Sequence, residues 1–329
     1  VNPTGPLHVG HARGAVIGSS LANVLEAAGY EVQREYYVND AGTQMRVFYD
    51  TLYSRVMQAS GRDVPLPDPA YPGDYLKTLA ADLLNDLGEK LGSKEKSEVI
   101  TQLAPESLSR TIDGIRHTLE RLGVFYDQWF HESGLLLSGR FDQVMDFLKD
   151  SNLIVDRDGA QWFAATKLGL DEDIVVIRSG DADPTYFATD IAYHHEKFME
   201  RKFDRVINVW GADHHGHIAR MHAVLTAFGL DPDRLTIILN QIVNFKNEGE
   251  SLKFSKRNNV IVTVEELLDE VGSDACRFIF LSRSPDSHME FDLGLAKRRS
   301  SENPVYYVQY AHARMASILR TAEEKGINF

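Results

Sequence analysis

The chain has 329 residues, of which 43% are hydrophobic and 25% are charged, and its formal net charge is −13. This composition is enough for a core in one large or two ordinary domains. It excludes a membrane-spanning class, because no run approaches the roughly 18 apolar residues that a span needs. With the single Cys276 and no secretory signal, we expect a cytoplasmic protein with neither a disulfide framework nor a membrane partner. The acidic balance argues only weakly against a nucleic-acid partner, because a basic patch can lie on an acidic protein.

Two histidines, His8 and His11, precede an apolar-periodic segment that predicts a helix from Ala15 to Ala28. The free N–H groups and the positive dipole end at a helix start favour phosphate oxygens. Gly5 and Gly10 would leave room for a ligand beside the backbone. Charged imidazoles there would stabilise negative charge on a phosphoryl group. A lone His-x-x-His pair remains a weak motif, since histidines satisfied by the protein itself are more common.

The surrounding stretch is more specific: Asn2-Pro3-Thr4-Gly5-Pro6-Leu7-His8-Val9-Gly10-His11. It resembles the HIGH signature of class I aminoacyl-tRNA synthetases, in the form found in bacterial arginyl-tRNA synthetases. The resemblance implies that His8 and His11 are catalytic, that Gly10 and His11 bind ATP, and that Asn2 holds the arginine backbone. The chain opens inside this motif, so we expect it to be part of a longer protein.

A strand–loop–helix rhythm follows, with a strand expected from Glu31 to Val38 and a helix from Thr43 to Gln58. This rhythm predicts an α/β fold with a doubly wound parallel, Rossmann-like sheet. Asn39-Asp40 in the connecting loop fits turn and cap chemistry as well as a functional role. Gly61 to Pro72 reads as a loop that opens a helical insertion, and Val155 to Ile177 reads as an antiparallel hairpin.

The stretch from Pro184 to His195 leads into a helix, with Thr189 or Asp190 as the expected cap. Tyr186 and Asp190 stand four residues apart, so one helical turn would bring them to the same face. A guanidinium group pairs best with a planar carboxylate, and an aromatic ring beside it adds a cation–π attraction. The alternative is that Asp190 only caps the helix. In the family resemblance these two residues correspond to the pocket for the arginine side chain.

Farther along, Asp204 to Trp210 reads as a buried strand ending in Gly211-Ala212-Asp213-His214. An acid at the carboxyl edge of such a strand can bind a ribose diol. The resemblance implies that Asp213 and His217 bind ATP and that His214, or else Gln241, completes the arginine pocket. A metal site is the rival interpretation, because the segment is rich in histidine. We expect no structural metal, since His214 has a histidine directly beside it and no compensating cysteines are present.

The last motif, Lys253-Phe254-Ser255-Lys256-Arg257, lies in a polar loop between a strand expected from Thr236 to Phe245 and a helix expected from Val264. Without its context it would be an ordinary surface loop. It resembles KMSKS, the second class I signature, with Phe in place of Met and Arg in place of the last Ser. The resemblance implies that Lys253 and Lys256 are catalytic and that Ser255 and Lys256 bind ATP, with the lysines neutralising the phosphates as pyrophosphate leaves.

The resemblance spans nearly the whole chain and implies an arginyl-tRNA synthetase, catalytic portion, ending in the start of an all-helical C-terminal domain. Its substrates would be L-arginine, ATP with Mg²⁺, and tRNA(Arg), and we expect a monomer. In this family arginine activation generally requires tRNA. The alternatives are another HIGH-type nucleotidyltransferase, such as a cysteinyl or methionyl synthetase, or a non-catalytic synthetase-like binding protein. The expected divisions are two halves of the nucleotide-binding domain at 1–60 and 123–262, a helical insertion at 61–122, stem-contact-like helices at 263–300, and a truncated anticodon-binding domain at 301–329.

Overall fold

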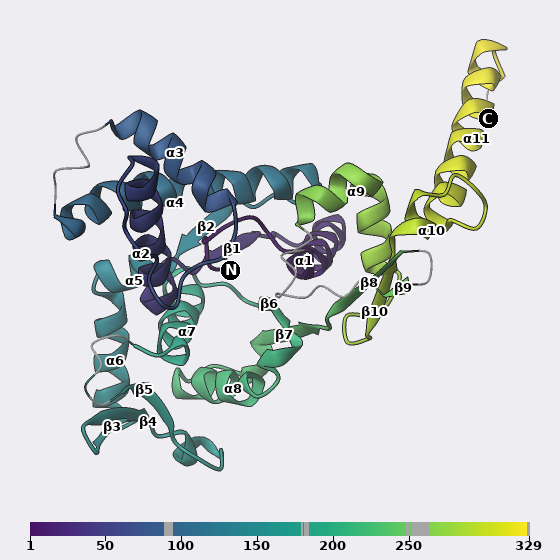
Figure 1. Ribbon diagram of the computed structural model, residues 1–329. Coiled ribbons are helices and arrows are strands. Elements are labelled where there is room, and N and C mark those ends of the chain that lie inside the picture. Colours follow the sequence, from purple (N-terminus) through teal and green to yellow (C-terminus); the bar gives the residue numbers. More distant parts are fainter. Residues whose placement is uncertain (89–94, 179, 181–183, 248–249, 252–262, 328–329) are drawn as a thin grey trace. The chain divides into compact units, whose positions relative to one another are not determined.

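The computed structural model describes residues 1–88, 95–178, 180, 184–247, 250–251 and 263–327 (Figure 1). The chain forms two compact units. The first unit comprises Val1–Pro6, Glu31–Arg116 and Tyr126–Leu239; the second comprises Leu7–Tyr30, His117–Phe125 and Asn240–Phe329. Within the described ranges, none of the helices combines the length and the apolar character that crossing a membrane requires.

The strands of the first unit form three small sheets. β1 (Glu35–Val38) pairs in parallel with β2 (Gln128–His131), and β6 (Val206–Gly211) pairs with β7 (Leu235–Asn240). The predicted hairpin is present as the antiparallel sheet of β3 (Ile154–Arg157), β4 (Ala160–Phe163) and β5 (Ile174–Ile177). Because parallel strands end at the same edge, the residues that follow β1 and β2 come together.

The helices of the first unit pack on two apolar cores. The smaller core joins α2 (Gly42–Ala59), α3 (Tyr75–Leu87) and the early part of α4 (Lys96–Arg121), with α2 and α3 side by side (Figure 1). The larger core contains the apolar faces of the other helices and the strands that they cover. These helices are α5 (Glu132–Leu137), α6 (Arg140–Asp150), α7 (Tyr186–His195) and α8 (His217–Ala227).

The second unit is built around α1 (Val9–Ala27), which packs against α9 (Val264–Leu281). Beside them, β8 (Val243–Asn247) pairs in parallel with β10 (Met289–Asp292) and antiparallel with the short β9 (Glu250–Ser251). The unit continues with α10 (Leu293–Lys297) and α11 (Pro304–Glu324). α9 bends at Gly272, whose φ of 79° is left-handed, so two helical segments meet there.

The structure corrects three expected boundaries. The first helix begins at Val9 and not at Ala15, because the His8 side chain caps it. The strand expected from Thr236 to Phe245 is two strands, β7 and β8, because the Gln241 N–H between them donates to the Pro285 carbonyl over 2.9 Å. The described strands also pair in four small sheets, so the α/β class with parallel pairs is present, whereas one continuous doubly wound sheet is not seen among them.

Candidate functional site

The two histidines of the opening motif lie at the start of α1 in the second unit. The Gly10 N–H donates to His8 Nδ1 over 3.1 Å, and the two imidazole centroids are 6.3 Å apart. A Cβ on Gly10 would meet His8 Nδ1 at 3.2 Å, so glycine permits this cap. Burial lowers the pKa of His8, and burial lowers the pKa of His11 to about 4. Both rings are therefore neutral at pH 7, which corrects the expectation of charged imidazoles.

The space beside the two glycines of the motif is also different from expectation. A Cβ on Gly5 would meet the Tyr75 ring at 2.6 Å, because the Tyr75 hydroxyl donates to the Thr4 carbonyl there. Gly10 makes room for His8, as described above. The glycines thus accommodate side chains of this chain, where we had expected them to accommodate a ligand.

The start of α9 is paired with the same histidine motif. His8 and Thr263 form an antiparallel β-bridge, and the Val264 N–H donates to the Leu7 carbonyl over 2.9 Å. Thr263 and Glu266 cap α9 reciprocally, in a capping box. Lys253, Ser255 and Lys256 of the lysine motif lie outside the described residues. Thr263 is the first described residue after that motif, and it pairs with His8.

A buried arginine fixes the neighbouring backbone. Arg13 on α1 is 0% exposed, and its guanidinium donates to the carbonyls of Gln241, Ser284 and Ser287 over 3.2, 2.7 and 2.9 Å. These carbonyls flank β8 and β10, the paired strands that precede and follow the lysine motif in sequence. One guanidinium therefore ties the histidine-bearing helix to both strands, and the sequence analysis missed this residue.

The predicted guanidinium pocket lies on α7 in the first unit. The N-cap is Thr185, whose side chain accepts from the Ala188 N–H. Thr189 and Asp190 are therefore inside the helix, and the expectation that either of them caps it is wrong. Tyr186 is 57% exposed and stands one turn before Asp190, so both share a helix face. Burial raises the pKa of Asp190 to about 7; Lys197 acts in the opposite direction, and Glu132 adds to the rise.

A second carboxylate near Asp190 was not predicted. Glu132, the first residue of α5, is 4% exposed, and its Oε2 has no hydrogen-bond partner. Burial is the main cause that raises its pKa, and the negative charge of Asp40 adds to the rise. Asp40 follows β1 and accepts from the Ser133 N–H over 2.9 Å, so it pins α5 and does not cap α2. Glu132 directly follows β2, and an acid at the end of a parallel strand is the signal that could have revealed it.

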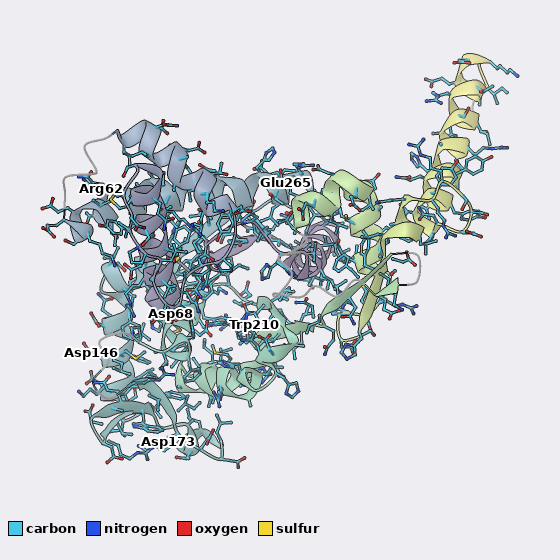
Figure 2. All side chains as sticks on the ribbon, in the orientation of Figure 1. Arg62, Asp68, Asp146, Asp173, Trp210 and Glu265 are labelled. Atoms are coloured by element: carbon cyan, nitrogen blue, oxygen red, sulfur yellow. The ribbon has the colours of Figure 1, made fainter. Side chains whose placement is uncertain are left out.

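The predicted nucleotide residues lie between β6 and α8. Trp210, labelled in Figure 2, is a half-buried residue near the end of β6, and its ring centroid is 5.7 Å from that of His214. The Asp213 side chain is 84% exposed, with Oδ1 3.9 Å from His214 Nε2. A Cβ on Gly211 would meet Asp213 Oδ1 at 2.6 Å, so a larger residue there would displace this carboxylate from its present position. Burial is the main cause that lowers the pKa of His217, whose ring lies 5.6 Å from that of His214.

The remaining predicted residues are placed as follows. Asn2 belongs to the first unit, where its carbonyl accepts from the Thr4 N–H over 2.8 Å; Gln241 belongs to the second unit, bound by Arg13. The structure thus brings Tyr186 and Asp190 together on α7, and Asp213, His214 and His217 together at β6. As to the rival metal interpretation, the described part of the chain holds no group of three or more His, Cys, Asp or Glu arranged to bind a metal.

Comparison with known proteins matches residues 2–287 to the family described as tRNA synthetases class I (R), catalytic domain. An arginine–tRNA ligase of Dehalococcoides mccartyi strain BAV1 is 50% identical over 328 residues, which are 100% of this chain and 59% of that protein. The chain therefore spans about three fifths of the length of the curated relatives that it matches.

Solved structures give the same result. A Campylobacter jejuni structure that carries the name of an arginyl-tRNA synthetase is 37% identical with a TM-score of 0.88, covering 98% of this chain and 70% of that one. The arginyl-tRNA synthetase of Thermus thermophilus is 23% identical with a TM-score of 0.72, covering 98% and 63%, and it supports the fold alone.

Proposed function

Because the chain belongs to the class I tRNA synthetases for arginine, we propose that the polypeptide containing it activates L-arginine with ATP and transfers the arginyl group to tRNA(Arg). The observation that carries the proposal is the proximity of two carboxylates, the half-buried Asp190 and the buried Glu132, with the exposed ring of Tyr186 on the same helix face as Asp190. Two neighbouring carboxylates that form no salt bridge among the described residues suit a guanidinium ligand.

In the proposed pocket, Asp190 and Glu132 bind the guanidinium and the Tyr186 ring lies beside it. The arginine backbone is held by Asn2, with His214 or Gln241 completing the site. Lysine and apolar amino acids would leave these acceptors unpaired, so discrimination needs no editing step. The guanidinium would also lower the pKa of Asp190 on binding, because a neighbouring positive charge favours the carboxylate.

ATP would be bound at Gly10, His11, Asp213, His217, Ser255 and Lys256, with Asp213 accepting hydrogen bonds from the ribose. His8 and His11, neutral in the free protein, would donate N–H groups to the phosphates, while Lys253 and Lys256 supply positive charge. We expect Mg²⁺ to arrive on the ATP phosphates, as it commonly does in nucleotide sites.

The proposed reaction has no covalent enzyme intermediate. A carboxylate oxygen of arginine attacks the α-phosphorus of ATP, a P–O bond forms, and the bond to pyrophosphate breaks. A hydroxyl of the terminal tRNA ribose then attacks the arginyl carbonyl and releases AMP. The residues act by positioning and by stabilising charge.

We further propose that the protein is a monomer and acts in the cytoplasm. Residues 1–60 and 123–262 would together form the doubly wound sheet, with an insertion at 61–122. Residues 263–300 would contact the tRNA stem, and residues 301–329 would begin an anticodon-binding domain.

The test is arginine-dependent ATP–pyrophosphate exchange by the natural polypeptide that contains residues 1–329, with and without tRNA(Arg). Asp190→Asn should raise the KM for arginine about 100-fold, because charged hydrogen bonds contribute about 1.5–3 kcal/mol each, and leave the KM for ATP within about twofold. The control is Asp146→Asn, an exposed carboxylate on α6 labelled in Figure 2. An equal rise in both KM values would contradict the pocket, and exchange without an arginine requirement would contradict the function.

A further inference from the structure

A lysine is buried directly behind the proposed guanidinium pocket. α7 does not end at His195 but continues as a π-helical turn over Glu196–Glu200. Such turns are rare and displace the residues that follow them from the regular helical positions. Here Lys197 is 7% exposed, and its Nζ lies 3.7 Å from the centroid of the Tyr193 ring. Burying a charged lysine to this extent costs free energy unless its ammonium group is paired or hydrogen-bonded.

A directional chain of hydrogen bonds joins Lys197 to the turn of α7 that bears Asp190. The Lys197 ammonium donates to Asn208 Oδ1 over 3.3 Å, Asn208 Nδ2 lies 2.8 Å from His194 Nε2, and His194 Nδ1 lies 2.8 Å from the Asp190 carbonyl. A carbonyl only accepts, so His194 Nδ1 carries the proton and Nε2 accepts from Asn208. Burial lowers the pKa of His194 to about 3, which keeps the ring neutral and the chain in this order.

Two of the carboxylates near Lys197 have salt bridges to arginines, whereas Asp190 has none among the described residues. Glu35 on β1 is held by Arg201 Nη1 at 2.7 Å, and Glu196 is held by Arg140 Nη1 at 2.9 Å. Asp190 makes no salt bridge of its own among the described residues. Lys197 is the positive charge that acts on it. In the part of the chain that the structure describes, removing Lys197 would thus leave the Asp190 carboxylate without a counter-charge.

We propose that Lys197 is a positioning residue for arginine recognition, which keeps the Asp190 carboxylate ionised in the empty pocket and, through Asn208 and His194, fixes the helical turn that presents it. The inference rests on the proposed function, since it concerns how the same pocket takes up a guanidinium. Lys197 would thus control the ionisation of the pocket carboxylate without itself contacting the ligand.

The consequence is a defined pH dependence. The pKa of Asp190 is about 7, so lowering the pH below this value protonates the carboxyl and weakens guanidinium binding. Loss of the Lys197 charge raises the pKa of Asp190 further and moves this acid limb to higher pH. The pKa of Lys197 itself is lowered to about 8 by burial, so its charge is lost above that pH. The ionised carboxylate and the charged lysine therefore coexist mainly between about pH 7 and pH 8, and the acid limb is the part of the profile that the lysine charge controls.

Other groups around the pair remain in place in the lysine variants. Glu132 on α5 and Tyr37 on β1 face Asp190, Asp40 faces Glu132, and β5 offers no titratable side chain. The charged residues that act on Lys197 are Glu35, Asp190, Glu196 and Arg201. None of these is changed by substituting Lys197, so a shift in the acid limb reports the lysine charge.

The experiment compares Lys197→Gln, Lys197→Met and Lys197→Arg in the natural polypeptide with tRNA(Arg) present. Gln keeps a donor for Asn208 but has no charge, Met has neither, and Arg keeps the charge. We expect both neutral variants to move the acid midpoint of kcat/KM for arginine up by about one pH unit and to raise the KM for arginine about tenfold at pH 7. Lys197→Arg should retain the wild-type midpoint, and the KM for ATP should stay within about twofold. Lys149→Met, an exposed lysine on α6, is the charge-loss control.

The outcomes separate the two proposals. Absence of arginine-dependent exchange in the wild type overturns the proposed function. An active wild type whose Lys197→Gln variant keeps the wild-type midpoint overturns the inference, as does an equal loss toward arginine and ATP, which a merely structural role would give. If both neutral variants fail to fold, Asn208→Ala decides, because it breaks the chain between Lys197 and His194 and leaves the lysine in place. It must raise the KM for arginine while that for ATP stays within about twofold, and an unchanged KM for arginine overturns the inference.

Discussion

Among the described residues, each of the two units buries one Lys or Arg side chain, and the two side chains have different roles. In the second unit, Arg13 is 0% exposed and its guanidinium donates hydrogen bonds to three backbone carbonyls. In the first unit, Lys197 is 7% exposed, donates to one side-chain oxygen and acts on the Asp190 carboxylate without a salt bridge to it. A guanidinium is planar and has five donors, so it can hold several chain segments in place at once. An ammonium group is a compact charge and is better suited to shifting the ionisation of a neighbouring group. Arg13 should therefore matter most for stability, and Lys197 for the pH dependence of binding.

The largest effect is expected from breaking the Arg13 anchor. Arg13→Met removes three hydrogen bonds between a charged donor and backbone carbonyls, and such bonds contribute about 1.5–3 kcal/mol each, so the free energy of unfolding should fall by at least about 3 kcal/mol. Urea unfolding, with hydrogen exchange of the α1 amides to locate the loss, measures it. Arg13→Lys keeps the positive charge but lacks the planar guanidinium, so its free energy of unfolding should lie between those of the wild type and Arg13→Met. A fall in the free energy of unfolding below about 1 kcal/mol would show that Arg13 does not anchor these segments.

A smaller effect on stability is expected when Lys197 is replaced. Lys197→Met leaves Asn208 Oδ1 unpaired but also removes the cost of a buried charge, so the free energy of unfolding should fall by only about 1–2 kcal/mol at pH 7. The same urea titration gives this value, read beside that of Arg13→Met. If Lys197→Met proved as destabilising as Arg13→Met, Lys197 would have to be regarded as a structural anchor too.

The smallest effect belongs to a cation that is not buried. Lys149 Nζ lies 3.8 Å from Asp156 Oδ2, and both side chains are exposed. Lys149→Met should change the free energy of unfolding by less than about 0.5 kcal/mol, because water and salt screen such pairs. Thermal unfolding at low and high salt tests this, and a loss comparable to that of Lys197→Met would show that burial is not what separates the three cations.

Elements with strong local signals were predictable from the sequence. α2 has an apolar period and is found within one residue of its predicted bounds at Gly42–Ala59, and the turn at Asp158-Gly159 does connect β3 to β4. The pairing of Tyr186 with Asp190 follows from helical spacing alone. The start of α1 was missed because its cap is a histidine side chain, which is not among the residues that usually cap helices.

The buried polar residues were not predictable in the same way. Arg13, Glu132 and Lys197 owe their roles to partners that lie far away in the chain, such as the carbonyls of Ser284 and Ser287. No local period or motif reports such a partner. The split between β7 and β8 has the same origin, since it depends on the carbonyl of Pro285. Sequence patterns thus indicate which groups are available, and tertiary contacts decide which of them are used.

The cap at the start of α1 also fixes which tautomer His8 adopts. Because Nδ1 accepts from the Gly10 amide, the proton of the neutral ring must reside on Nε2. The free ring therefore has a defined donor at Nε2, the form that the proposed role toward an oxyanion requires. A Cβ at position 10 would lie 3.2 Å from Nδ1, so the ring would have to shift by a few tenths of an ångström to keep this bond.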